Sequence, residues 1–208
     1  MNLAGELRVG AEALGISLQQ SQYDQLLEFL QLLGKWNQVY NLTAITEPRK
    51  MLSHHLLDSL SLLPSLLGAR KVLDVGSGAG LPGIPLAIAM PDTFWMMLDS
   101  NARKTRFIRQ AIAHCGLHNT QVVQVRVQDY HAPDSLDFIV SRAYAPLAEF
   151  CDSVAHLLTP NTRLLTMKTG LKPGEARQLN SDRFAFEEVS LQVPGIGQTR
   201  SLVTITPI

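Results

Sequence analysis

Three glycines at alternating positions follow a short apolar run that contains one acidic residue. The run is Val72–Val75, the acid is Asp74, and the glycines are Gly76, Gly78 and Gly80. Glycine adopts positive φ at little cost and has no Cβ to keep a ligand away from the backbone. A strand, a tight glycine turn and a helix N-terminus in succession form a recurring binding site for nucleotide-like molecules. The spacing therefore predicts that such a molecule binds at this turn.

The glycines fit two overlapping registers. Gly78, Gly80 and Gly83 give G-x-G-x-x-G, the spacing of dinucleotide-binding proteins. That register needs the strand to continue to Ser77, although Gly76 and Ser77 are poor strand residues. The other register, G-x-G-x-G from Gly76, begins where the apolar run stops, and it resembles the motif of class I S-adenosylmethionine (AdoMet) methyltransferases. We favour the second register.

Polar residues after the next two predicted strands could complete a nucleoside site. Asp99 follows the strand predicted over 93–98, and a carboxylate at this place can accept both ribose hydroxyls. The segment 126–129, which reads R-V-Q-D, follows the strand predicted over 121–125. Its backbone and a polar side chain can meet an adenine ring there. We expect Asp74 to organise the glycine turn, with an approach to the ligand through water as the alternative.

The segment after the fourth predicted strand, 141–146, reads S-R-A-Y-A-P. It lacks the N/D-P-P-aromatic motif typical of methyltransferases that act on amino nitrogens of nucleic-acid bases. A cytosine-carbon methyltransferase needs a cysteine nucleophile, but neither Cys115 nor Cys151 is predicted at a strand end. The acceptor is therefore expected to be nucleophilic without losing a proton, as N7 of guanine is, and positioning becomes the main requirement. Arg142 stays protonated, so it would bind substrate or cofactor rather than act as a base.

Basic residues cluster near the predicted carboxyl ends of the strands, where ligands bind in open α/β sheets. Besides Arg142, they are Arg126, Lys168 and Arg200, with Arg103, Lys104, Arg106 and Arg109 at the start of the helix predicted over 102–115. A phosphate-binding rim is one interpretation, and a solvated helix face or structural ion pairs are the others. His55 and Asp58 are predicted to share one helix face as a buried hydrogen-bonded pair. No set of residues predicts a metal site.

Composition limits the class of protein. The 208 residues are 46% hydrophobic and 17% charged, which is typical of a globular protein with a substantial core. Eighteen basic and eighteen acidic side chains balance, so any nucleic-acid contact must come from a local basic patch. The two distant cysteines predict buried free thiols in a reducing cytosol. The sequence predicts neither a secretory signal nor a membrane span, and we expect a cytoplasmic monomer.

The residues up to 68 predict a helical extension. Helices are expected over 3–14, from an N-cap at Ser17 to a break at Gly34, and from Pro48 to about Leu63. From residue 69 the pattern alternates between strands and helices. The strands are predicted over 72–75, 93–98, 121–125, 136–141, 163–168, 184–193 and 201–205, and the helices over 82–90, 102–115, 146–158 and 173–179.

This alternation predicts an α/β, Rossmann-like fold of the class I AdoMet-dependent methyltransferase type. Its sheet would have seven strands, and the last two, which have no helix between them, would form an antiparallel pair. The chain would divide into an extension over 1–68, packed on the core, and an AdoMet-binding domain over 69–208.

Five motifs together resemble one family. They are K-W-N-x-x-Y-N-L-T (35–43), H-x-L-D-S (55–59), L-D-V-G-S-G-A-G-L-P-G-I-P (73–85), L-D-S-x-x-R-K-x-R-F (98–107) and S-R-A (141–143). Their identity and order are similar to those of the bacterial small-subunit ribosomal RNA methyltransferase G family, also called glucose-inhibited division protein B. The resemblance implies AdoMet-dependent methylation of N7 of one guanosine in the 16S rRNA of the 30S subunit, in the bacterial cytoplasm.

The same resemblance assigns site residues. Those implied to bind AdoMet are Gly76, Gly78, Gly80, Leu81, Asp99, Val127, Gln128 and Arg142. Asp99 would hold the ribose, and Arg142 is also the catalytic candidate. Those implied to contact rRNA or the target base are Arg103, Lys104, Arg106, Arg126, Lys168 and Arg200.

Two other functions stay open from the sequence. A small-molecule methyltransferase with the same fold would have an enclosed apolar acceptor pocket instead of an open basic rim. A ribosome-assembly protein would bind AdoMet without turnover. Transfer of a labelled methyl group to rRNA separates the three functions.

Overall fold

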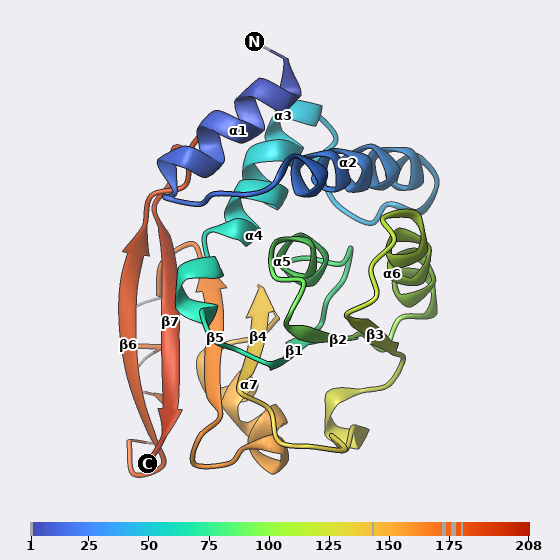
Figure 1. Cartoon of the computed structure of the whole chain (residues 1–208). Helices are drawn as coiled ribbons and strands as arrows, with labels where there is room; N and C mark the ends of the chain where they lie inside the picture. The colour runs from blue at the N-terminus through green and yellow to red at the C-terminus, as the bar shows by residue number, and fades with distance from the viewer. Residues whose placement is uncertain (1, 143, 172–173, 176–177, 180) are drawn as a thin grey trace.

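The computed structural model describes residues 2–142, 144–171, 174–175, 178–179 and 181–208. Within these residues seven strands form one sheet with the order β3-β2-β1-β4-β5-β7-β6 (Figure 1). The strands are β1 (Lys71–Val75), β2 (Phe94–Leu98), β3 (Thr120–Val123), β4 (Phe138–Arg142), β5 (Arg163–Lys168), β6 (Phe184–Leu191) and β7 (Arg200–Pro207). The first five are parallel, whereas β7 pairs antiparallel with both β5 and β6. The predicted fold class is confirmed.

Burial on both faces explains why the central strands are nearly continuous apolar runs. Alternate side chains enter two clusters: Val72 and Trp95 pack on one face of the sheet, and Leu73 and Met96 pack on the other. Val72 lies opposite Trp95, and Leu73 lies opposite Met96. Paired residues of β1 and β2 therefore point to the same face of the sheet. Asp74, two residues after Val72, therefore faces the same side as Val72.

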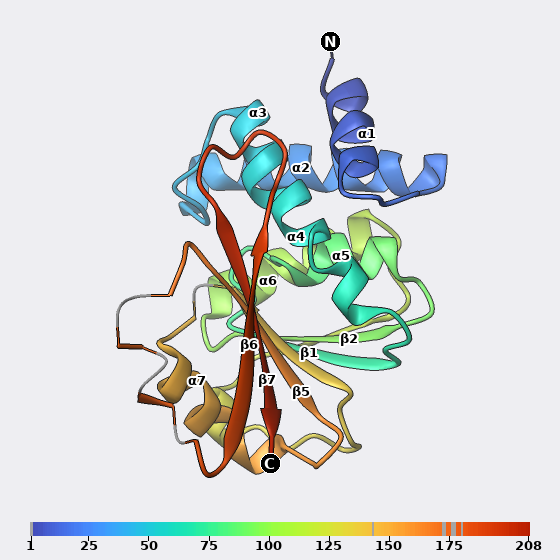
Figure 2. The same cartoon turned by 90° about the vertical axis from the view of Figure 1, so that its left-hand side faces the viewer.

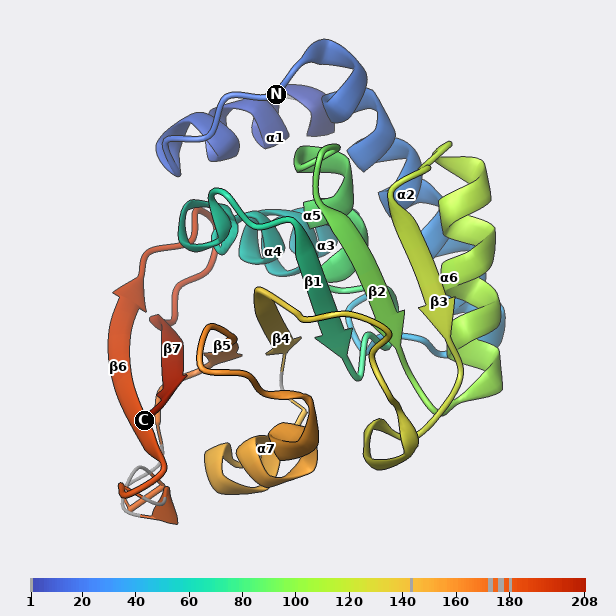
Figure 3. The ribbon, with the colours of Figure 1, turned by 60° about the horizontal axis from the view of Figure 1, so that its bottom comes forward.

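The two faces of the sheet are covered by different helices (Figure 2). Helices α5 (Gly83–Ala89) and α6 (Ala102–His114) lie on the Val72 face, and α7 (Leu147–Val154), followed by a 3₁₀ turn (Ala155–Leu157), lies on the other. Figure 3 shows the arrowheads of β1, β2 and β3 pointing the same way. Their carboxyl ends, and that of β4, therefore share one edge of the sheet. The helix predicted over 173–179 includes residues 173, 176 and 177, which lie outside the described residues.

The N-terminal extension packs on the Val72 face, against α5 and α6 (Figure 1). Its elements are α1 (Leu3–Ala13), α2 (Gln20–Tyr40), α3 (Pro48–Met51), a π-helical turn (Leu52–Leu57), α4 (Asp58–Leu60) and a 3₁₀ turn (Leu63–Leu66). Phe29 and Trp36 of α2 both contact Phe107 of α6, with ring centroids 6.3 and 5.5 Å apart. The extension thus shares an apolar cluster with the sheet, and its boundary at residue 68 stays a prediction.

Helix α2 begins two residues later than predicted. Its N-cap is Gln19 instead of Ser17, and the Gln19 backbone N–H donates to Gln22 Oε1 at 2.8 Å. A reciprocal contact of this kind fixes the first turn of a helix. The predicted start of the next helix at Pro48 is confirmed, because proline occupies the first helical position of α3.

Helix α2 also ends later than predicted, because Gly34 does not break it. The helix continues to Tyr40 and ends at Asn41, whose φ of 49° is left-handed. Glycine in a helix interior costs only about 1 kcal/mol relative to alanine. Trp36, which follows the glycine in the chain, packs against Phe107, and this contact favours continuation of the helix.

Replacing Gly34 with alanine is expected to stabilise the protein by about 0.5–1 kcal/mol, because alanine has the higher helix propensity. A Cβ at this position would meet no atom within 4 Å. Gly10→Ala in α1 is the matched control, since its Cβ would lie 2.4 Å from Cδ1 of the buried Leu57. That variant should lose about 1–3 kcal/mol through overpacking. Urea unfolding of both variants checks the prediction, and a destabilised Gly34→Ala protein would contradict it.

Candidate cofactor and substrate site

Asp99 is fixed beside the glycine turn at the carboxyl end of β2. Its Oδ2 accepts the Gly78 N–H at 3.0 Å, and its Oδ1 accepts the Asn101 N–H at 2.8 Å. Lys104 Nζ lies 3.7 Å from Oδ2. The glycines of the turn have the positive φ that the motif predicts, for example 70° at Gly76. Because a carboxylate oxygen has two lone pairs, each oxygen of Asp99 can still accept one hydroxyl.

The backbone N–H groups of the turn are largely used within the protein. Those of Gly76 and Ser77 donate to the Leu98 carbonyl at 2.8 and 3.1 Å. Those of Gly80 and Leu81 donate to the Ser77 carbonyl at 2.8 and 2.9 Å. A diphosphate needs free N–H groups at such a turn. The turn therefore suits a nucleoside held by a carboxylate better than a dinucleotide, which favours the AdoMet register.

Asp74 is completely buried behind the turn. Its Oδ2 accepts the Gly83 N–H at 3.1 Å, and its backbone carbonyl accepts the Ser77 hydroxyl at 2.9 Å. Burial raises the pKa of the Asp74 carboxyl to about 7. A Cβ at Gly83 would lie 2.7 Å from Oδ2, so glycine is needed for this approach. These contacts agree with the expectation that Asp74 organises the turn.

The AdoMet-binding candidates after β3 lie on a short 3₁₀ turn, Val127–Asp129. Val127 is buried and Gln128 is exposed. The side chain of Tyr144 approaches the glycine turn from the loop after β4. A Cβ at Gly76 would lie 2.7 Å from Tyr144 Cδ2, so the ring packs directly on this glycine. Tyr144 therefore lies at the junction of the turn and the neighbouring cavity.

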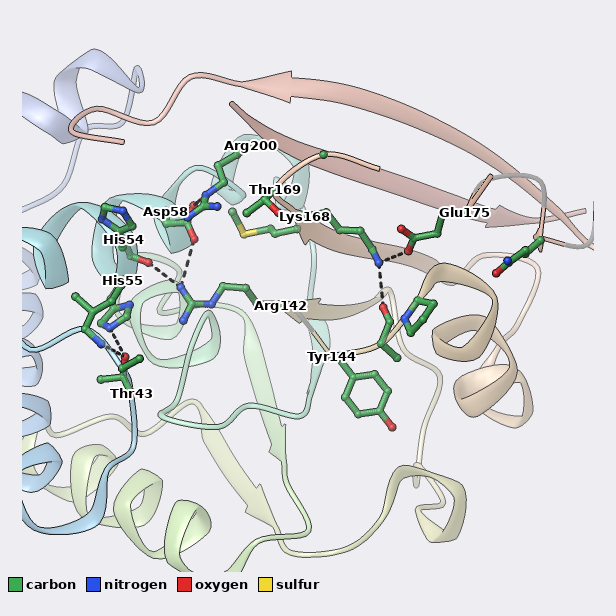
Figure 4. Close-up of a pocket in the computed structure, with 17 residues that line it drawn as sticks. Thr43, His54, His55, Asp58, Arg142, Tyr144, Lys168, Thr169, Glu175 and Arg200 are labelled. Atoms are coloured by element: carbon green, nitrogen blue, oxygen red, sulfur yellow. Dashed lines mark hydrogen bonds and ion pairs between the residues drawn. The ribbon is translucent and has the colours of Figure 1, made fainter. Parts of the chain in front are cut away.

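That cavity has a volume of about 800 Å³ and is lined by both the extension and the sheet (Figure 4). Its charged side chains are Asp58, Arg142, Lys168, Glu175 and Arg200. The three cations and two acids place charged groups in the cavity that are, together, net positive. Its size lies within the range of small-molecule and cofactor sites.

Asp58 connects two of these cations. Its Oδ1 accepts from Arg200 Nε at 3.0 Å, and its Oδ2 accepts from Arg142 Nη1 at 3.3 Å. Arg142 Nη1 also donates to the backbone carbonyl of His54 at 2.8 Å. The side chains of Asp58, Arg200 and Arg142 are 5%, 14% and 22% exposed, so the contacts are well shielded from water. Burial lowers the pKa of Arg142, and the nearby Asp58 carboxylate opposes that shift.

His55 and Asp58 do not form the predicted pair, although both are buried. His55 Nε2 lies 3.0 Å from the Thr43 hydroxyl, and Asp58 contacts the two arginines. The reason is local. Residues 52–57 form a π-helical turn, which has more residues per turn than an α-helix and rotates His55 away from Asp58.

His55 is expected to make the protein less stable in acid. Burial and the charge of Arg142 lower its pKa from 6.5 to about 4. Below pH 6.5 the unfolded state binds a proton that the folded state does not, so stability falls as pH falls. His55→Gln should remove this loss, which amounts to about 2 kcal/mol between about pH 7.5 and about pH 5.

Urea unfolding of wild type and His55→Gln at the two pH values measures this difference, with the exposed His118→Gln as control. Relative to wild type, His55→Gln should have a higher free energy of unfolding at the lower pH than at the higher pH. An equal pH dependence of the two proteins would show that His55 does not titrate as described.

Lys168 occupies the opposite end of the cavity. Its Nζ donates to the Ala145 carbonyl at 3.0 Å and forms an ion pair with Glu175 Oε1, which also accepts the Leu147 N–H at 3.0 Å. Lys168 therefore joins the end of β5 to the start of α7. Glu175 was not identified from the sequence, where it is an isolated acid in a polar segment.

The basic residues predicted to contact RNA fall into two groups. Arg103, Arg106 and Arg126 are exposed. Lys104, Lys168 and Arg200 are partly buried and contact Asp99, Glu175 and Asp58 respectively. The structure thus brings Arg142, Lys168 and Arg200 together in one cavity, with Lys104 beside Asp99.

Three further features concern metal ligands, membrane-spanning helices and the cysteines. Among the described residues, no three His, Cys, Asp or Glu side chains are grouped as metal ligands would be, and no helix there is long and apolar enough to cross a membrane. Cys115 and Cys151 are both buried free thiols, and burial raises the pKa of each to about 12. They are therefore poor nucleophiles at neutral pH.

The sheet order and the glycine turn define the fold as that of class I methyltransferases. An AdoMet-dependent methyltransferase from Aquifex aeolicus has a similar structure, with a TM-score of 0.57 and 17% identity over 85% of this chain and 98% of that one. At this identity the likeness shows the fold alone.

Sequence similarity identifies the family. The model of the rRNA small subunit methyltransferase G family matches residues 22–203. The ribosomal RNA small subunit methyltransferase G of Laribacter hongkongensis is 44% identical over 205 residues, covering 99% of both chains. The protein of the same name from Nitrosococcus oceani is 47% identical over 209 residues, covering 100% of this chain and 97% of that one. The chain belongs to the rRNA small subunit methyltransferase G family.

Proposed function

We propose that the protein transfers a methyl group from AdoMet to N7 of one guanosine in 16S rRNA of the small ribosomal subunit. The observation that carries the proposal is the cavity beside the glycine turn, whose charged side chains are net positive, in a chain that matches the family along nearly its whole length. The partner is then 16S rRNA or the 30S subunit, and the place of action is the cytoplasm.

The residues at the glycine turn fit the cofactor. Asp99 has one free lone pair on each oxygen for the ribose hydroxyls, and Gly76, Gly78, Gly80 and Leu81 would lie along the nucleoside. Val127 and Gln128 would meet the adenine. AdoMet, when bound, supplies an electrophilic methyl group on a positively charged sulfur.

The cavity fits a nucleotide better than a small apolar acceptor. An enclosed apolar pocket would support a small-molecule methyltransferase, but this cavity is lined by three cations and two acids. N7 of guanine has a lone pair and carries no proton, so no general base is needed. The protein then contributes mainly orientation, for which Arg142 is the leading candidate because it lies at the junction of β4, the extension and the cavity. The exposed Arg103, Arg106 and Arg126 would contact phosphates.

Methyl transfer to rRNA tests the proposal. The protein is incubated with labelled AdoMet and either 30S subunits or protein-free 16S rRNA from bacteria that lack the modification. We expect label in 16S rRNA from at least one of these substrates. AdoMet binding without any incorporation would instead support a ribosome-assembly protein that retains the cofactor without turnover.

A further inference from the structure

Two arginines and one carboxylate from three distant parts of the chain form a single cluster in the cavity (Figure 4). Asp58 begins α4, Arg142 ends β4 and Arg200 begins β7. We infer that Asp58 is a positioning residue, which holds Arg142 and Arg200 as one donor array toward the acceptor oxygens of the target nucleotide. This inference rests on the proposed function and adds a role for a residue of the extension.

The hydrogen-bonding capacity of the cluster leaves donors free for a ligand. A guanidinium has five N–H donors, and Arg142 uses only Nη1 while Arg200 uses only Nε. Among the described residues, Nε and Nη2 of Arg142 and both Nη atoms of Arg200 have no protein partner. The three side chains together carry one net positive charge in a shielded place. An acceptor-rich nucleotide, with guanine O6 and phosphate oxygens, matches this array.

Asp58 also keeps the two cations together. Two guanidinium groups that approach without an anion between them repel each other, and the repulsion is strong where water is partly excluded. The carboxylate contacts both through different oxygens, so it fixes their separation as well as their charge balance. Because Asp58 is buried, it is itself held in place by the surrounding core.

The π-helical turn before Asp58 provides the third contact of the cluster. The Asp58 backbone N–H donates to the carbonyls of Ser53 and His55 and not to that of His54, its partner in a regular α-helix. The His54 carbonyl accepts from Arg142 instead. The turn thus presents one carbonyl and one carboxylate to the same guanidinium. π-helical turns occur frequently at functional sites, and this one orients Arg142.

Asp58→Asn tests the positioning role, because asparagine keeps the shape and one acceptor oxygen but removes the charge. Asp137→Asn is the matched control. Asp137 Oδ2 also accepts two N–H groups, from Arg70 and Lys71 at 2.7 and 2.8 Å, but it lies at the opposite end of the strands. Each variant is assayed for AdoMet affinity by calorimetry, for thermal unfolding, and for kcat and KM of rRNA methylation at saturating AdoMet.

We expect Asp58→Asn to lower kcat/KM for rRNA about 10- to 100-fold through misplaced arginines, with AdoMet affinity changed less than about threefold. Asp137→Asn should lower the unfolding temperature without changing kcat/KM. Near-normal turnover of folded Asp58→Asn would overturn the inference, as would a loss confined to AdoMet affinity, which would place the array on the cofactor. An inactive wild type would count against the proposed function instead, so the two failures are distinguishable.

Discussion

Arg142→Ala is expected to lower kcat/KM for rRNA methylation at least about a hundredfold, because the group that orients the acceptor is lost. The guanidinium joins the end of β4 to the His54 carbonyl and to Asp58, and alanine makes neither of these contacts. The fold should persist, since Asp58 keeps its contact with Arg200. Two acceptor oxygens, Asp58 Oδ2 and the His54 carbonyl, lose their Arg142 partner, which should cost about 1–3 kcal/mol of stability each.

Arg142→Lys is the control that separates charge from geometry. Lysine keeps the positive charge but has one ammonium group in place of a planar fork. It should therefore recover only part of the activity. Kinetics of methyl transfer, with circular dichroism and AdoMet titration of each variant, measure the effect. Near-normal turnover in a well-folded Arg142→Ala protein would show that the residue is not needed for catalysis.

Asp99→Ala is expected to weaken AdoMet binding more than about a hundredfold, because two hydrogen bonds to a charged acceptor are lost and each contributes about 1.5–3 kcal/mol. The substitution also removes the acceptor of the Gly78 and Asn101 N–H groups, so the turn itself would loosen. Lys104, 3.7 Å from the carboxylate, would lose its partner.

Asp99→Asn serves as the comparison. Asparagine retains one acceptor oxygen but lacks the charge, and its amide nitrogen cannot accept a backbone N–H. Calorimetric titration with AdoMet should rank the affinities as wild type, then Asp99→Asn, then Asp99→Ala. Unchanged affinity in either variant would argue that the ribose is held elsewhere, and the glycine turn would then need another explanation.

Much of the fold could be predicted because its signals are local. The buried strands are short apolar runs, and turns or helices with clear starts separate them. The absence of a helix before the last strand predicted the antiparallel pairing of β6 with β7. Asp99 was found for the same reason, since it directly follows a strand and lies beside the glycine turn.

The errors in the extension have physical causes that sequence patterns do not record. Gly34 is a weak helix breaker, and tertiary packing of Trp36 overcame it. The π-helical turn at 52–57 changed which side chains face each other. The predicted pair of His55 and Asp58 is therefore wrong, although both residues are buried as predicted. Residue spacing predicts which side chains share a face only in a regular helix, and one π-helical turn is enough to change those faces.

The cavity could be identified only from the three-dimensional arrangement of the chain. Asp58, Arg142 and Arg200 were each noticed, but their contacts join segments that are 84 and 142 positions apart in the chain. Lys168 and Arg200 were predicted as basic residues near strand ends that contact rRNA or the target base. The structure shows that each forms an ion pair with an acidic residue. The roles of these residues toward AdoMet and rRNA stay predictions.

The identity of the methylated atom tests the central claim most directly. 16S rRNA lacking the modification is treated with the protein and labelled AdoMet, digested to nucleosides and analysed by chromatography with mass spectrometry. We predict that the label is in 7-methylguanosine, at one position of the rRNA. Label in any other nucleoside, or none from a folded protein that binds AdoMet, would contradict the account.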